Sequence, residues 1–168
     1  MNRSSEALFA ERARRMAAVE NREQRRGTPL ALFRRHRLLY GLRLSQVLGA
    51  GRMRSLSPAP GAAAYLAGLT LHRGRLLSLV DLPTLWGHTQ QGMFDLPSFV
   101  VVGVGKAELG VLTEELVGLF EVDAPISAWE GEPRVGVSAV TQHERENVIV
   151  LDAQALVTDP AITGGARG

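Results

Sequence analysis

The sequence contains no cysteine, a single lysine and no long apolar run. The lack of cysteine excludes disulfides, thiolate metal ligands and a cysteine nucleophile. A membrane-spanning helix needs about 20 consecutive, mostly apolar residues, so we expect no direct insertion into a membrane. The first residues, MNRSSEALFAERARR, also lack the apolar segment of a secretory signal. We therefore expect a cytoplasmic protein.

A phosphate-binding loop is missing as well. The glycine-rich stretch that ends in Gly105-Lys106 has Val100 where the loop motif requires glycine, and Ala107 where it requires serine or threonine. A β-strand, and not a helix, is predicted to follow. We interpret this stretch as a strand end and a turn, and expect no nucleotide cofactor.

No other catalytic or metal-binding pattern is present. Glu114 and Glu115 are neighbours on a predicted strand, where they point to opposite faces and cannot share a proton. The histidines lack the close spacing of a zinc-binding helix; they are His36, His72, His88 and His143. We expect no enzymatic activity, no metal and no cofactor.

Charge is unevenly distributed along the chain. Residues 1–54 hold 13 basic and 4 acidic residues, a balance of +9, whereas residues 55–168 hold 6 and 13, a balance of −7. A basic head can bind nucleic acid, an anionic membrane or an acidic protein, or can be a solvated helix. Aromatic residues that could stack on bases are scarce, since Phe33 and Tyr40 are the only ones near the predicted basic hairpin at residues 30–44. This scarcity and the acidic body count against nucleic-acid binding, which the basic head keeps as the alternative interpretation.

Residues 4–26 are predicted to form a helix with one narrow apolar stripe. The stripe consists of Phe9, Ala13, Met16 and Val19, and the other faces carry arginine and glutamate. Such a stripe is too thin for a buried helix, so we expect it to dock on a groove of this protein or of a partner.

From residue 30 onward the pattern predicts an all-β barrel architecture, because short apolar runs recur about every ten residues. The run at residues 99–104 is continuous and β-branched, which is typical of a strand buried on both faces. Asp152 is expected to cap a short helix over residues 153–157. The residues beyond, 159–168, are predicted to form a mobile tail.

Three segments form a recognisable series along the chain. They are LLYGLRLSQV at residues 38–47, the proline-glycine turn at residues 58–61, and AAAYLAGLTLHRGRLLSLVDL at residues 62–82. Together with the closing VIVLDAQALV, this series resembles the CheW-like family of chemotaxis coupling proteins. The residues that match the family pattern in register are Gly68, Arg73, Gly74, Val80, Asp81 and Leu82.

The resemblance implies two packed five-stranded SH3-like barrels over residues 28–158, after a helical extension at residues 1–27 and before the tail. It also implies a non-enzymatic signalling adaptor or scaffold at membrane-associated receptor arrays. Such an adaptor couples the cytoplasmic tip of a chemoreceptor to the regulatory domain of a CheA-type histidine kinase.

The chain departs from the family pattern at three positions. Leu71 stands where the family has asparagine, His72 follows where it has a hydrophobic residue, and Gly49 lies near a position that is often acidic in the family. A buried asparagine fixes the shape of a loop through bonds to backbone groups. These departures predict a divergent set of partners.

The candidate partner-binding residues follow from the same resemblance. They are Arg73, Gly74, His72, Leu71, Val47 and Leu48. A guanidinium at a turn can hold a partner's carboxylate, or can bond carbonyl groups of its own fold. Val47 and Leu48 are explained equally well as partner contacts and as core. Asp81 is interpreted as a structural strand end, with partner contact as the second possibility.

Overall fold

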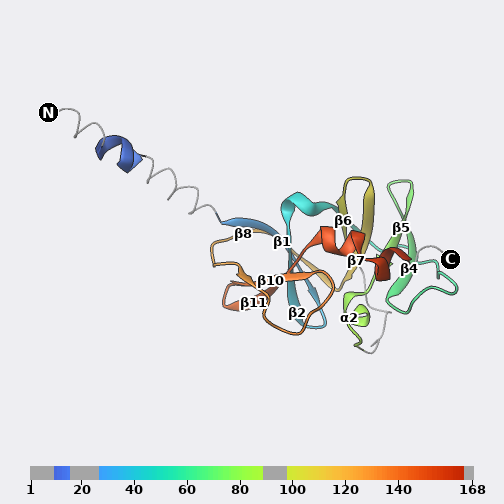
Figure 1. Ribbon diagram of the computed structural model, residues 1–168. Helices are drawn as coiled ribbons and strands as arrows, with labels where there is room; N and C mark the ends of the chain where they lie inside the picture. The colour runs from blue at the N-terminus through green and yellow to red at the C-terminus, as the bar shows by residue number, and fades with distance from the viewer. Residues whose placement is uncertain (1–9, 16–26, 89–97, 165–168) are drawn as a thin grey trace.

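A computed structural model describes residues 10–15, 27–88 and 98–164 of the chain. In that part, eleven strands form two sheets that are curled into small barrels and packed against each other (Figure 1). Residues 10–15 are helical and exposed, including Ala13 of the predicted apolar stripe. The other stripe residues lie outside the described residues.

The first barrel, called barrel 1 below, is built from both ends of the described domain. Its sheet has the strand order β8-β1-β2-β11-β10-β9, and β11 pairs with β2 in parallel. The strand bounds are Thr28–Arg35 (β1), Leu38–Arg43 (β2), Glu115–Val122 (β8), Ser127–Ala128 (β9), Val137–His143 (β10) and Glu146–Leu151 (β11).

The second barrel, barrel 2, comes from the middle of the chain and has the order β3-β6-β7-β5-β4. The bounds are Val47–Arg52 (β3), Leu66–His72 (β4), Arg75–Val80 (β5), Ser98–Val104 (β6) and Ala107–Thr113 (β7). A short 3-10 helix, η1 (Leu44–Gln46), leads into β3, and α2 (Leu82–Leu85) follows β5. Strands β3 and β4 are the two edges of this sheet, so they face each other across its seam.

The predicted all-β fold of two packed barrels is confirmed. Barrel 1 has six strands instead of the expected five, because the two-residue strand β9 pairs with β10. The predicted burial of residues 99–104 is also confirmed up to Gly103. Phe99 and Val101 face the core of barrel 2, whereas Val100 and Val102 face a second core between the barrels.

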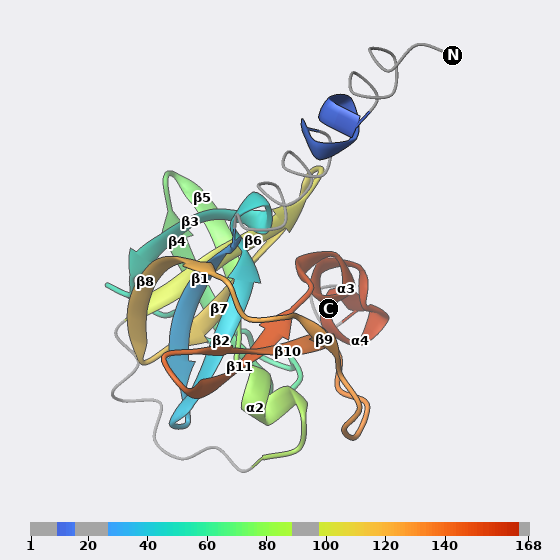
Figure 2. The same cartoon turned by 90° about the vertical axis from the view of Figure 1, so that its left-hand side faces the viewer.

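This core between the barrels is also covered by the C-terminal helices α3 (Ala153–Thr158) and α4 (Pro160–Gly164), which lie together in Figure 2. As expected, the carboxylate of Asp152 caps α3, where it accepts a 3.0 Å hydrogen bond from the backbone N–H of Gln154. The structure differs from the predicted mobile tail at α4. The side chain of Ile162 is buried in the core, which docks this helix on the barrels.

Candidate interaction surface

The hairpin of β4 and β5 places two large apolar side chains in solvent. Leu71 pairs with Leu76 across the hairpin, and these residues are 65% and 72% exposed. Their neighbours Thr70 and Leu77 point the other way and are buried, as the alternation of side chains along a strand requires. The core of barrel 2 therefore does not account for this leucine pair, which is available to a partner.

Arg73 and Gly74 form the turn of this hairpin, with φ angles of 49° and 76°. Two consecutive left-handed residues are typical of the tight hairpin turn whose twist matches the strands, and glycine adopts this conformation readily. Arg73 is exposed, and among the described residues its guanidinium has no hydrogen-bond or ion-pair partner. Arg75 differs, because its Nη1 lies 3.3 Å from Oε1 of Glu108.

Val47 and Leu48 on strand β3 differ in burial. Val47 is partly buried and packs against the core between the barrels. Leu48 is 48% exposed and lies over Gly103, where a Cβ atom would come within 2.5 Å of the leucine Cδ1. Val47 therefore supports the strand from within, and Leu48 is the one of the two that a partner can reach.

Gly49 brings β3 and the hairpin together. A Cβ atom at Gly49 would lie 3.8 Å from Nη2 of Arg73 and 3.9 Å from Nε2 of His72. The imidazole of His72 also meets the ring of Phe99 edge-on, with ring centroids 5.4 Å apart. Candidate residues from two separate stretches of sequence thus converge at one end of barrel 2.

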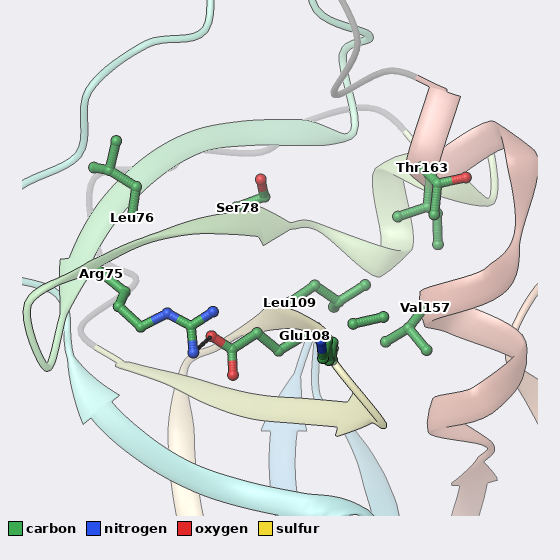
Figure 3. A pocket seen from close by; sticks show the side chains of 10 residues that line it. Arg75, Leu76, Ser78, Glu108, Leu109, Val157 and Thr163 are labelled. Atoms are coloured by element: carbon green, nitrogen blue, oxygen red, sulfur yellow. Dashed lines mark ion pairs between the residues drawn. The ribbon is translucent and has the colours of Figure 1, made fainter.

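A groove of about 300 Å³ runs beside the same hairpin, between strands β5 and β7 and the helices α3 and α4 (Figure 3). The ion pair of Arg75 and Glu108 lies on one side of it. Its apolar lining includes Leu76, Leu109, Val157 and Ile162. Sequence reasoning did not find this groove, because it depends on the docking of α4, a segment that was predicted to be mobile.

Asp81 does not contribute to the surface. It is fully buried, and its two carboxylate oxygens accept hydrogen bonds of 3.0 and 3.2 Å from the guanidinium of Arg35. A third guanidinium hydrogen bond, 2.7 Å long, goes to Glu114. Burial acts to lower the pKa of Arg35, but the two carboxylates overcome this effect and raise the pKa above its ordinary value. Asp81 therefore has a structural role, in agreement with its interpretation as a structural strand end.

The two aromatic residues of the basic β1–β2 hairpin are inaccessible. Phe33 and Tyr40 are each 1% exposed and stack on each other with ring centroids 5.5 Å apart. Burial raises the pKa of Tyr40 to about 12. Neither ring can stack on a nucleic-acid base, which further weakens the nucleic-acid alternative.

Within residues 10–15, 27–88 and 98–164, no group of three or more His, Asp or Glu side chains is arranged to hold a metal ion. No helix in these ranges is long and apolar enough to cross a membrane.

Comparisons with known proteins agree with the two-barrel fold. The family model of the CheW-like domain matches residues 29–161. A search of curated proteins gives no match. Among solved structures, the chain is similar to the scaffolding protein TtCheW from Thermoanaerobacter tengcongensis. That likeness has a TM-score of 0.67 and 16% sequence identity, and it covers 75% of this chain and 89% of the other. At this identity it supports the fold.

Proposed function

The chain belongs to the CheW-like domain family, and from this premise we propose that it is a non-enzymatic adaptor that couples chemoreceptors to a CheA-type histidine kinase. The observation that carries the proposal is the family match, which spans both barrels from residue 29 to residue 161. The partners would be the kinase's regulatory domain and the cytoplasmic tip of a receptor.

The partner surface that we propose is the end of barrel 2 formed by the β4–β5 hairpin and β3. Leu71 offers apolar area, Arg73 offers an unpaired guanidinium within the described residues, and the Arg73-Gly74 turn fixes both on a hairpin. His72 and Leu48 lie beside them, and Val47 holds β3 from the core side. A rigid hairpin loses little conformational entropy on binding, so its contacts translate efficiently into affinity.

An adaptor of this kind acts by holding its partners in fixed positions relative to each other. The two barrels share a continuous apolar core, so partners held at different faces are held at a fixed geometry. The bound receptor would then shift the population of active and inactive kinase through its differential affinity for the two states. No chemical step in the adaptor is needed.

The test is titration calorimetry of the purified chain against two proteins from the same genome, the kinase regulatory domain and a receptor-tip fragment. We expect saturable binding to both. A folded chain that binds neither would contradict the proposed function.

A further inference from the structure

We propose that the space over Gly49, bounded by His72 and Arg73 and called the Gly49 notch below, receives a carboxylate side chain of the protein partner. This inference rests on the proposed function and names the chemistry that the partner must bring to the surface. It assigns a role to Gly49, where the backbone itself does not require glycine.

Gly49 is not needed for its backbone conformation. Its φ lies outside the left-handed range that favours glycine, and only His72 and Arg73 come within 4 Å of the position of its missing Cβ atom. Gly51, two residues on, is different, because a Cβ atom there would come within 2.6 Å of the Phe99 ring. What glycine provides at position 49 is open space in the seam between the edge strands β3 and β4.

Two nitrogen groups converge on this space. Nη2 of Arg73 and Nε2 of His72 lie 3.8 and 3.9 Å from the same point, and within the described part of the chain neither side chain has a hydrogen-bond or ion-pair partner. The edge-on contact with buried Phe99 holds the imidazole of His72 in place. A guanidinium beside a second nitrogen donor is suited to an anionic oxygen pair.

Within residues 10–15, 27–88 and 98–164, no acidic side chain supplies the counter-charge. Residues 28–80, which include β3, β4 and β5, contain eight arginines and no aspartate or glutamate. Glu108, the acidic residue that reaches the hairpin, is engaged by Arg75. The local excess of positive charge therefore attracts an acidic group of a binding partner. The exposed apolar side chains of the hairpin favour a protein as that partner.

The experiment compares Gly49→Glu with Gly49→Gln, two side chains of the same size of which one brings its own carboxylate into the notch. We expect Gly49→Glu to weaken binding of the kinase regulatory domain or the receptor tip about tenfold, because a charge-assisted hydrogen bond to the partner is replaced internally. Gly49→Gln fills the same space without the charge, so it should weaken binding less than Gly49→Glu does. Equal affinities of the two variants would overturn the proposal.

A second measurement needs no partner. In urea unfolding of the free protein, Gly49→Glu should unfold at a higher concentration than Gly49→Gln, and the difference should vanish when Arg73→Gln is added to both. Absence of this coupling means that a carboxylate in the notch does not reach Arg73, which overturns the inference. If the variants show this coupling but the wild-type protein binds neither partner, the result contradicts the proposed function instead.

A third measurement separates carboxylate from phosphate. The same variants are titrated with a single-stranded oligonucleotide at low salt. We expect no binding that depends on Arg73. An oligonucleotide affinity that Arg73→Gln abolishes would assign the notch to phosphate and overturn the carboxylate proposal.

Discussion

Arg35 and Asp81 form a bidentate ion pair across the junction of the two barrels. Arg35 ends β1 of barrel 1 and Asp81 follows β5 of barrel 2, with Nε–Oδ1 and Nη2–Oδ2 distances of 3.0 and 3.2 Å. Both residues are buried, and Thr84 donates a further 2.6 Å hydrogen bond to Asp81. A fork-shaped guanidinium donates two parallel hydrogen bonds to a carboxylate in one plane only, so the pair fixes the orientation of one barrel against the other.

The first prediction concerns this pair. Asp81→Asn should lower the free energy of unfolding by about 3 kcal/mol, the lower end of the range for a broken buried ion pair, because the partly exposed Glu114 remains as the only carboxylate bonded to buried Arg35. Urea unfolding measures the change. The matched control is Arg34→Gln in the neighbouring residue, whose ion pair with Glu146 is partly exposed and should matter less. A loss no larger than that of the control would contradict the role of the pair.

The sequence predicted those parts of the fold that depend on local pattern. The run at residues 99–104 indicated a strand with two apolar faces, and Asp152 indicated a helix start, because both signals lie within a few residues. The pairing of Arg35 with Asp81 could not be found in this way. The two residues are 46 positions apart, and only the packing of the barrels brings them together.

The candidate surface also combines features that the sequence indicated with features that only the packing of the barrel creates. The resemblance indicated the Arg73-Gly74 turn, and the left-handed φ angles of both residues agree with a hairpin there. The contact between β3 and the hairpin at Gly49 required the closed barrel, since these edge strands are not hydrogen-bonded neighbours in the sheet. Docking of α4 through Ile162 was missed because one apolar residue near the end of a chain gives no periodic signal.

The second prediction compares two glycines on the same face of β3. Gly51→Ala should cost about 1–3 kcal/mol of stability, because its Cβ would overlap the buried ring of Phe99 and force the core to shift. Gly49→Ala has 3.8 Å of clearance and should stay within about 0.5 kcal/mol of the wild type. Chemical denaturation of both variants measures this. Equal losses would mean that the Gly49 notch is not open.

The third prediction concerns the C-terminal helix α4. Ile162→Ala should lower the free energy of unfolding by about 2 kcal/mol, because it removes buried apolar volume from the core between the barrels. Thr163→Ala, at the exposed neighbouring position, should cost less than about 0.5 kcal/mol. Thermal unfolding of the two variants is the measurement. An Ile162 variant as stable as the wild type would show that α4 is not docked.

The fourth prediction is a loss of stability at alkaline pH that depends on Tyr40. Burial raises its pKa in the folded protein to about 12, whereas the unfolded chain ionises at about 10. Between these values the folded state keeps the proton that the unfolded state has lost. Stability should therefore fall as the pH rises through this window, by up to about 1.4 kcal/mol per pH unit.

The comparison that isolates this effect uses Tyr40→Phe, which cannot ionise and should lose less stability between about pH 9 and about pH 12. Tyr65→Phe is the matched control, because Tyr65 is partly exposed and donates its hydroxyl hydrogen bond to the carbonyl of Ala161. Urea unfolding at the two pH values gives the difference. Wild type and Tyr40→Phe with the same alkaline loss would contradict the burial of the phenol.

The last prediction separates binding from folding at the exposed leucines. Leu71 on barrel 2 and Leu119 on barrel 1 are both 65% exposed, so Leu71→Ser and Leu119→Ser should change the free energy of unfolding by less than about 0.5 kcal/mol each. Only Leu71 lies on the proposed partner surface. Titration calorimetry with the kinase regulatory domain and the receptor tip should therefore reveal about a tenfold loss of affinity for Leu71→Ser with one of the two. Leu119→Ser should bind that partner as the wild type does. A larger loss of affinity for Leu119→Ser than for Leu71→Ser would indicate that the interface lies on barrel 1.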